Sequence, residues 1–239
     1  MGNLFQATFS INFFPDEWLI SKTVVIHKPG CHDYSTPKAY HPIALLDTMS
    51  KILSTCVTED LSWIANKHNL LPSTHFRGLP GCATTDSLHL ITKFIHDTWA
   101  HPTDHHVSIL FLDVKTAFPS IIPEWLFHNM WKCGVPKQYT DWYHVHLTGR
   151  QTVLCFNDYT SPSFNIESTI DQGCPLSTLA FLFYNTDILD IPNRKNSKTG
   201  AGFIDDIFFV AHGPTFPASN HKIQDIMECQ GGCLEWSRT

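Results

Sequence analysis

The sequence predicts an α+β fold in which helices alternate with strands that converge on one acidic centre. In the segment 202–211, the adjacent acids Asp205 and Asp206 stand between two apolar runs, as at the tip of a buried β-hairpin. Asp113, far upstream, follows a second apolar run. The composition is that of a globular chain, since 43% of the 239 residues are hydrophobic and 13% are aromatic. We therefore expect two strand regions, separated by helices, that meet at their acidic ends.

The first half of the chain predicts an extended region, two helices and a strand. Residues 14–47 contain β-branched runs and turn residues, which favour strands. Residues 48–68 place apolar side chains three or four positions apart, which predicts a helix. Thr84 or Thr85 is expected to N-cap the next helix. The nearly continuous apolar run 107–114 predicts a strand that is buried on both faces.

The second half of the chain predicts three further helices and two hairpins. Residues 123–132 form one expected helix, and another follows through about Leu147. The segment 151–170 alternates as a hairpin does. Residues 176–189 predict an apolar helix, and the polar segment 193–200 predicts a loop before the acidic hairpin.

The three acids predict a metal-binding centre. Adjacent side chains on a regular strand point to opposite faces, but a tight turn breaks this alternation, so at least one of Asp205 and Asp206 can face a metal. With Asp113 they form a set of hard oxygen ligands, which suits Mg²⁺. Two such ions about 3.5–4 Å apart serve in-line phosphoryl transfer. The alternative is that Asp113 simply ends a strand and the pair forms a solvated turn.

Five segments, in this order, resemble motifs of a known family. The segments are 40–46, 81–88, Asp113 with Ala117 and Phe118, 171–177, and 203–206. The last three resemble the core motifs of reverse transcriptases. The first two resemble finger motifs of reverse transcriptases from non-LTR (LINE-type) retrotransposons, and within those a fungal type. The resemblance runs from about residue 14 to residue 236.

The resemblance implies a right-hand polymerase fold with fingers and palm, in which an antiparallel palm sheet packs on helices. Residues 1–239 would form a reverse transcriptase domain fragment. Approximately 14–105 would be mostly fingers and 106–239 mostly palm, with a finger excursion near 124–165. The thumb that follows the palm in this family is expected to be absent.

The resemblance also implies an activity. The chain would be an RNA-directed DNA polymerase that transfers a nucleotide from a dNTP to a primer 3′-hydroxyl, with an RNA template and a DNA primer as partners. Two Mg²⁺ ions would be the cofactors, and Mn²⁺ could replace them. Asp113 and Asp205 would be the principal metal ligands, with Asp206 more peripheral, and the three would be catalytic.

Other site residues follow from the same resemblance. Phe118 matches an aromatic ring that lies beneath the incoming sugar and excludes a 2′-hydroxyl. Gln172 and Gly173 match the loop along the nascent base pair, where a glycine allows close backbone approach. The alternative for Phe118 is a simple core position.

Two finger positions would contact the nucleotide phosphates, and one would contact the template. Lys28 matches the finger lysine that binds the triphosphate, and its alternative is a solvated turn lysine. His41 stands where the family places a phosphate-binding arginine. Arg150 is a candidate finger or template contact.

The charge is unusual for a nucleic-acid enzyme. Sixteen Lys and Arg against 22 Asp and Glu give a formal net charge of −6. Relatives tend to carry arginine at the positions of His41, Cys82, Trp131 and Cys133, and single cytosine deaminations convert arginine codons to codons for these residues. The alternative function is therefore a decayed, inactive retroelement remnant that at most binds RNA. Phe118 disfavours a third candidate, a viral RNA-dependent RNA polymerase.

The sequence predicts an intracellular protein, in the nucleus or cytoplasm. It has no apolar run of the roughly 20 residues that span a bilayer, and no secretory signal. Its eight cysteines contain no C-x-x-C pair, which favours scattered reduced thiols over a zinc site.

Overall fold

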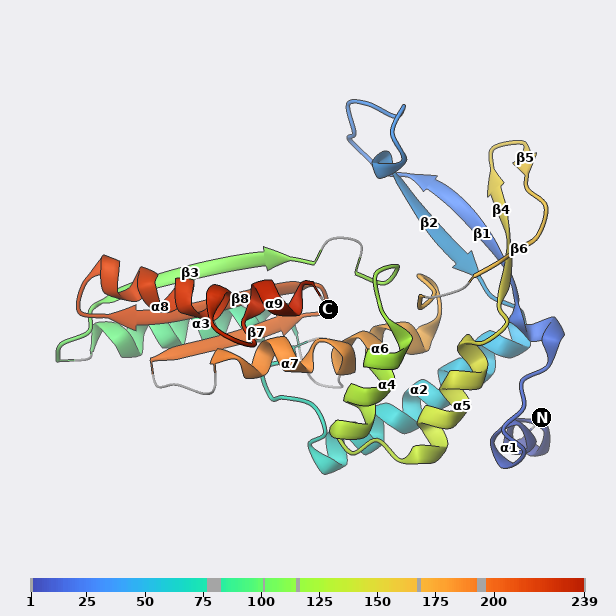
Figure 1. Cartoon of the computed structure of the whole chain (residues 1–239), viewed down its shortest axis with the longest axis horizontal. Helices are drawn as coiled ribbons and strands as arrows, with labels where there is room; N and C mark the ends of the chain where they lie inside the picture. The colour runs from blue at the N-terminus through green and yellow to red at the C-terminus, as the bar shows by residue number, and fades with distance from the viewer. Residues whose placement is uncertain are drawn as a thin grey trace. The chain divides into compact units, whose positions relative to one another are not determined.

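The computed structural model describes residues 2–76, 83–100, 102–114, 117–166, 169–192 and 197–238. These residues form an α+β structure with two sheets, as predicted (Figure 1). The chain divides into two compact units, one of residues 1–64 and 116–181, the other of residues 65–115 and 182–239. Residues 65–105 thus group with the strand that follows them.

The first unit contains a sheet with the strand order β2-β1-β4-β5, and β6 also pairs with β4. β1 runs antiparallel to β2 and parallel to β4, and β4 runs antiparallel to β5 and β6. Asn157, with a φ of 50°, forms the turn between β4 and β5, within the segment 151–170 that the sequence predicts to be a hairpin. The strands are β1 (Ile20–His27), β2 (Tyr40–Leu45), β4 (Gln151–Phe156), β5 (Tyr159–Thr160) and β6 (Phe164–Asn165).

Helices pack beside this sheet through an aromatic cluster. Phe9 stacks on Trp142 with ring centroids 5.0 Å apart, and the buried Phe14 meets the same ring edge-on. This contact joins the N-terminal helix α1 to α5. The helices that lie wholly or largely in this unit are α1 (Gly2–Ser10), α2 (Thr48–His68), α4 (Pro123–Lys132), α5 (Lys137–Leu147) and α6 (Pro175–Tyr184), with short 3₁₀ turns at Asp16–Leu19 and Pro37–Ala39.

The second unit contains an antiparallel sheet in the order β3-β8-β7. Alternate residues of β8 pack on its two faces, because Ile207 and Phe209 contact the cluster of α7, α8 and α9, whereas Phe208 and Val210 contact α3. Both faces are therefore covered, which explains the apolar run around the acidic pair. The elements are β3 (His106–Asp113), β7 (Lys198–Phe203), β8 (Asp206–Gly213), α3 (Thr84–Trp99), α7 (Thr186–Asp190), α8 (Phe216–Glu228) and α9 (Cys233–Trp236).

Several predicted elements are confirmed and four details differ. The helices expected at 48–68 and 123–132 have those bounds. β3 begins one residue earlier than expected, and it lies at the edge of its sheet with Phe111 69% exposed, so the expectation of a strand buried on both faces is wrong. The helix expected at 176–189 is instead two helices, which Asn185 separates. The N-cap residue of α3 is Ala83 and not Thr84 or Thr85, and the Ala83 N–H donates to the Asp86 carboxylate at 2.6 Å. The sequence analysis did not predict α1, α8 or α9.

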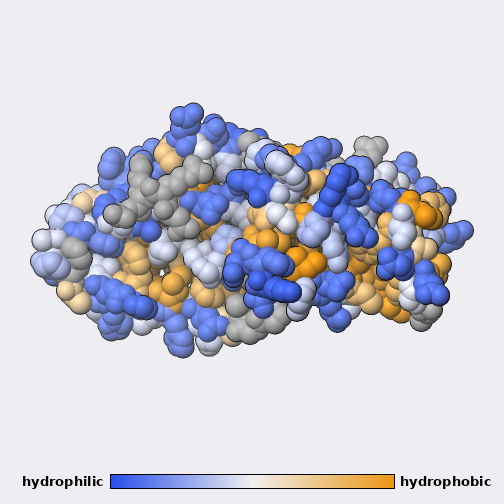
Figure 2. Space-filling view, turned by 90° about the horizontal axis from the view of Figure 1, so that it is seen from below, coloured by the Kyte–Doolittle hydropathy of each residue, from blue (hydrophilic) through white to orange (hydrophobic). Residues whose placement is uncertain are grey.

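The surface is mixed in character. On the face drawn in Figure 2, hydrophilic side chains cover most of the surface, and apolar side chains show between them in separate areas. Within the described ranges, no helix is long and apolar enough to cross a membrane.

Candidate active site

The three acids of the predicted centre lie at one end of the β3-β8-β7 sheet. Phe203 pairs with Asp206, so β7 and β8 are joined by the two-residue turn Ile204-Asp205. On the other side of β8, Asp113 pairs directly with Asp206. Side chains at directly opposed positions of antiparallel strands have Cβ atoms about 4.5–5.5 Å apart. The structure therefore brings together the carboxylates that the sequence predicts, although they are far apart in the chain.

The environment of Asp206 is both negative and partly apolar. Burial raises the pKa of Asp206, and the neighbouring charges of Asp205 and Asp113 raise it further. Asp206 also lines a hollow of about 340 Å³ between α3 and the strand ends. Its walls are mostly apolar, and they consist of Ser87, Leu88, Ile91, Phe111, Leu112, Phe203, Asp206, Ile207 and Phe208.

The turn that carries Asp205 is strained. Ile204 has a φ of 63°, whereas Asp205 is not among the residues with positive φ, which is the pattern of a type II′ turn. Glycine normally occupies the first central position of such a turn, and a β-branched residue there is an outlier. Strain of this kind costs on the order of 1–3 kcal/mol and persists only where the surrounding structure imposes it.

The donor chemistry of the three acids fits a hard divalent cation. Asp113 and Asp206 are exposed, and Asp205 is partly exposed, so their oxygens are accessible. Their mutual repulsion, which contributes to the raised pKa of Asp206, is what a divalent cation would relieve. Across the described part of the chain, no three Asp, Glu, His or Cys side chains already converge as a complete ligand set. The three carboxylates thus lie at the same end of the sheet, but they do not form a ready-made ligand set around one point.

Two predicted nucleotide-binding residues lie on the β1–β2 hairpin of the first unit. Lys28 follows β1 and is partly exposed, with its N–H bound to the Ala39 carbonyl at 2.8 Å. His41 lies on β2 opposite Ile26, with its side chain exposed. Both side chains are therefore accessible to a ligand.

The Gln172-Gly173 loop lies against the same hairpin. The Ala44 N–H donates to the Gln172 carbonyl at 2.8 Å, three residues after His41 on β2. Gly173 has a φ of 137°, and a Cβ there would lie 2.2 Å from the Ala44 carbonyl oxygen. Glycine is thus required at this position by contact with β2, a reason that differs from the nucleotide approach expected from the sequence.

Phe118 lies in a turn of the first unit and is half-buried. Its ring lies 5.6 Å from that of Phe181, and its carbonyl accepts a hydrogen bond from the Ile170 N–H at 3.5 Å. This contact places Phe118 beside the helix that follows the Gln172-Gly173 loop. The proposed sugar gate and that loop are therefore parts of the same unit.

Arg150 does not have the position that the sequence analysis expected. It is 3% exposed, and its Nη1 lies 2.7 Å from Oδ2 of the buried Asp171. Its Nε also donates to the Leu147 carbonyl at 3.2 Å, and its Nη2 donates to the Thr169 carbonyl. The guanidinium is thus used inside the protein, where it fixes the residue before Gln172, and the expectation of a template contact is corrected.

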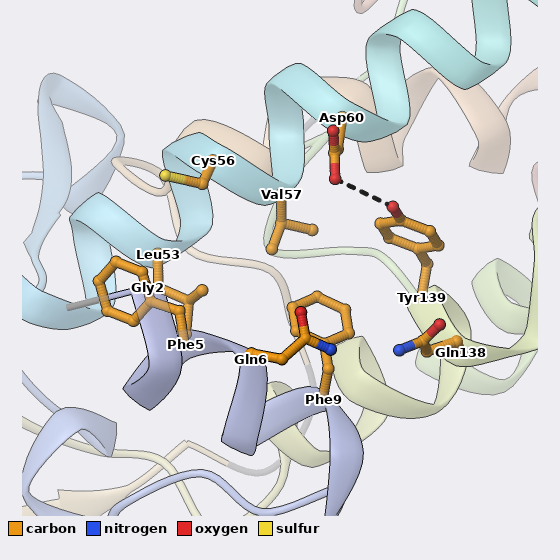
Figure 3. Close-up of a pocket in the computed structure, with 10 residues that line it drawn as sticks. All are labelled: Gly2, Phe5, Gln6, Phe9, Leu53, Cys56, Val57, Asp60, Gln138 and Tyr139. Carbon is orange, nitrogen blue, oxygen red and sulfur yellow. Dashed lines mark hydrogen bonds between the residues drawn. The ribbon is translucent and has the colours of Figure 1, made fainter.

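A second cavity, of about 310 Å³, lies between α1, α2 and α5 (Figure 3). Its two polar groups that face each other are already paired, because the Tyr139 hydroxyl donates to the Asp60 carboxylate at 3.1 Å. Burial and the nearby Asp60 raise the pKa of Tyr139. The cavity contains no nucleophile–base pair, so we regard it as a packing gap.

The match to a known family extends over most of the chain. Residues 26–236 match the model of the family described as reverse transcriptase (RNA-dependent DNA polymerase). The chain belongs to the reverse transcriptase family. The motif segment 81–88 is described only from residue 83 onward, so Gly81 and Cys82 lie outside the described residues.

Curated relatives come from mobile elements of Drosophila melanogaster. The chain is 28% identical over 191 residues to the probable RNA-directed DNA polymerase from transposon BS, a match that covers 80% of this chain and 20% of the relative. It is 27% identical over 208 residues to the probable RNA-directed DNA polymerase from transposon X-element, covering 85% and 22% respectively. The chain thus spans about a fifth of the length of these relatives, which are non-LTR retrotransposon proteins as the sequence predicts.

Solved structures confirm the polymerase fold. Apo telomerase from Candida tropicalis, truncated from its C-terminal domain, superposes with a TM-score of 0.65 at 10% identity. The match covers 92% of this chain and 48% of the telomerase. The shared feature is the fold.

Sequence reasoning missed two buried residues, one in each unit, that contact candidate site residues or their neighbours. Asp171 was read only as part of a motif, and its buried partner Arg150 gives no local signal. Asn185 donates from Nδ2 to the Ile204 carbonyl at 2.8 Å, and it is fully buried. A signal was present, because Asn185 begins a polar run of three residues, 185–187, that interrupts the segment expected to form one helix.

Proposed function

We propose that this chain forms the polymerising core of a retrotransposon reverse transcriptase, which adds dNTPs to a primer 3′-hydroxyl on an RNA template. The observation that carries the proposal is the register that sets Asp113 opposite Asp206, beside the turn residue Asp205. Asp113 and Asp205 are the principal metal ligands, and Asp206 is more peripheral. When bound, two Mg²⁺ ions, or Mn²⁺ in their place, would lower the pKa of the 3′-hydroxyl and neutralise charge on the pyrophosphate.

The residues of the first unit bind and select the nucleotide in this proposal. The accessible Lys28 binds the triphosphate, and His41 stands beside it in place of a stronger arginine contact. Gln172 and Gly173 line the nascent base pair. The ring of Phe118 excludes a 2′-hydroxyl by steric contact.

Fingers and palm divide the chain in this proposal. The β1-β2-β4 sheet belongs to the fingers, which comprise most of 14–105 and an excursion near 124–165, and the β3-β8-β7 sheet belongs to the palm, which comprises most of the rest of 106–239. An RNA template, a DNA primer and dNTPs are the partners, and they place the activity in the nucleus or cytoplasm.

Primer extension tests the proposal. We expect the purified chain to extend a DNA primer on an RNA template weakly with Mg²⁺ or Mn²⁺, and Asp113→Asn to abolish the extension. Asp158→Asn, in the exposed β4–β5 turn, is the matched control and should retain it. Extension that survives Asp113→Asn would contradict the proposal.

The second candidate is a remnant that binds RNA without polymerising. His41 favours it, because the shorter histidine stands where the family places a phosphate-binding arginine fork. RNA binding that is unchanged in Asp113→Asn, together with no extension by any variant, would support this candidate over the first.

A further inference from the structure

We propose that Asn185 is a positioning residue that holds the acidic turn in its strained conformation and thereby sets the position of Asp205. The inference rests on the proposed polymerase function, and it concerns how this chain builds the metal-binding end of its β3-β8-β7 sheet. Asn185 lies between α6 and α7, outside the acidic motif itself.

The turn needs an external hydrogen-bond donor. In a two-residue hairpin turn the carbonyl of the first central residue lies outside the ladder between the strands, so the Ile204 carbonyl must bind another group. Ile204 is 8% exposed, which leaves little access for water. The Asn185 Nδ2 supplies the donor at 2.8 Å.

Asn185 is suited to this contact and to little else. It is fully buried, and a buried amide without a partner is strongly disfavoured. Because the Ile204 carbonyl is an acceptor, the amide must present its NH₂ group to the turn. Within the described residues, its Oδ1 has no hydrogen-bond partner. The Asn185 side chain therefore donates to the Ile204 carbonyl from Nδ2, while its Oδ1 has no hydrogen-bond partner among the described residues.

The contact also explains the interruption between α6 and α7. Asn185 has φ −95° and ψ 12°, outside the helical values of its neighbours, where the sequence pattern predicts a continuous helix. The interruption of the helix orients the Asn185 side-chain amide toward the Ile204 carbonyl.

Asp205 is thereby fixed from both sides. The peptide before it is held by Asn185 through the Ile204 carbonyl. Its own carbonyl accepts a hydrogen bond from the Val114 N–H at 3.2 Å, next to Asp113 on the neighbouring chain segment. Loss of the Asn185 donor would let the Ile204 peptide rotate to relieve its positive φ, and this rotation would move the Asp205 carboxylate relative to Asp113 and Asp206.

Mn²⁺ binding to the purified chain, followed by electron paramagnetic resonance, measures the effect without requiring turnover. Asn185→Leu removes the donor, and we expect about tenfold weaker Mn²⁺ binding. Asn185→Asp keeps the side-chain volume and also removes the NH₂ group, so it gives the same test if the leucine variant does not fold. Thr186→Val is the matched control, because it removes a neighbouring buried hydroxyl, which donates to the Phe183 carbonyl, and leaves the Asn185 amide in place.

A rescue separates positioning from general destabilisation. Glycine adopts positive φ without strain, so in an Ile204→Gly background the turn no longer depends on Asn185. Asn185→Leu should then weaken Mn²⁺ binding less than threefold relative to Ile204→Gly alone. Thr186→Val should lower Tm and leave Mn²⁺ affinity unchanged.

Three outcomes overturn the inference, and they show whether the proposed function fails with it. If Asp113→Asn abolishes Mn²⁺ binding while Asn185→Leu and Asn185→Asp bind as the unmodified chain does, Asn185 has only a structural role and the proposed function stands. The same conclusion follows if the tenfold loss is equally large in the Ile204→Gly background. If Asp113→Asn leaves Mn²⁺ binding unchanged, the metal does not bind at this turn, and the proposed function and the inference fail together.

Discussion

At the scale of single residues, Gly173 lies so close to β2 that a larger residue would collide with it. A Cβ at Gly173 would lie 2.2 Å from the Ala44 carbonyl oxygen, and its φ of 137° disfavours other residues. We predict that Gly173→Ala lowers the free energy of unfolding by at least about 2 kcal/mol, from backbone strain and overpacking together. Urea denaturation measures this.

Gly30→Ala is the matched control for this substitution. Gly30 also has a positive φ, of 79°, but a Cβ there would meet no atom within 4 Å. Its substitution should cost only about 1 kcal/mol of conformational strain. Equal losses in the two variants would show that contact with Ala44 is unimportant.

The buried His146 predicts an acid-sensitive fold. Burial first, and then the nearby charge of Arg150, together lower its pKa to about 3. The unfolded chain binds a proton near pH 6.5 while the folded chain does not, so the stability that His146 allows at neutral pH is lost as pH falls from about 6.5 toward 3.

Replacement of this ring should flatten the acid limb of the stability curve. His146 stacks on Trp142 and contacts Phe14 edge-on, so His146→Phe preserves the shape of the cluster. We expect the loss of stability between pH 6.5 and 4 to shrink by on the order of 3 kcal/mol. His144→Phe, at an exposed position of the same helix, should leave the curve unchanged. Thermal unfolding across this pH range measures the stability of both variants. An acid limb that is equally steep in His146→Phe and in the unmodified chain would contradict the prediction.

At the scale of elements, local patterns predict the strands and helices that carry the site. The apolar runs around Asp113 and the Asp205-Asp206 pair predict β3 and the β7–β8 hairpin, and these elements are confirmed. The break at Asn185 could not be predicted from periodicity, because its cause is a hydrogen bond to a distant turn. α8 was missed although Thr215 caps it by accepting from the Ala218 N–H, because its polar sequence hides the apolar face.

The acidic hairpin should be stabilised by a divalent cation. The raised pKa of Asp206 means that the folded chain becomes less stable as pH rises through that pKa, because ionisation adds a third like charge. Asp206→Asn should therefore unfold at a slightly higher temperature than the unmodified chain at pH 7 without cation. The gain should be about 0.5 kcal/mol or less, since Asp206 is largely exposed.

A lower pH and an added divalent cation should each reduce this difference in unfolding temperature between Asp206→Asn and the unmodified chain. It should narrow as pH falls toward the ordinary Asp value near 4, and Mg²⁺ should stabilise the unmodified chain more than Asp206→Asn. Differential scanning fluorimetry with and without Mg²⁺ measures both effects. Asp158→Asn, in an exposed hairpin turn, should respond to Mg²⁺ as the unmodified chain does. An equal response of Asp206→Asn would place the cation elsewhere.

At the scale of the whole molecule, the sequence predicts the family and the polymerase fold. It does not predict which basic side chains are accessible to a ligand. Arg150 illustrates the reason, because nothing in its sequence context indicates that it will be buried and paired with Asp171. In contrast, Trp131 is 71% exposed and His41 is exposed, so both occupy surface positions where a relative's arginine would meet solvent or a ligand. The shortage of basic residues therefore concerns the outer surface.

Restoration of arginine should increase nucleic-acid affinity. Arginines at His41, Cys82, Trp131 and Cys133 would change the formal net charge from −6 to −2. Each new phosphate contact steepens the dependence of log K on log salt by about 0.9 for a duplex. We expect the variant with all four arginines to bind an RNA–DNA hybrid at least about tenfold more tightly in low salt. The slope of log K against log salt should be steeper by up to about 3.6.

Fluorescence anisotropy over a series of KCl concentrations tests this, and a charge-matched variant identifies its cause. Neutral amides at four exposed acids give the same net charge without new arginines; these acids are Asp16, Glu17, Asp33 and Glu59. This control should raise affinity only modestly and leave the salt slope nearly unchanged, because long-range attraction is screened beyond about 10 Å. If the control matches the arginine variant, net charge alone governs binding, and the four positions are not phosphate contacts. If only the arginine variant steepens the slope, those positions lie along the path of the nucleic acid.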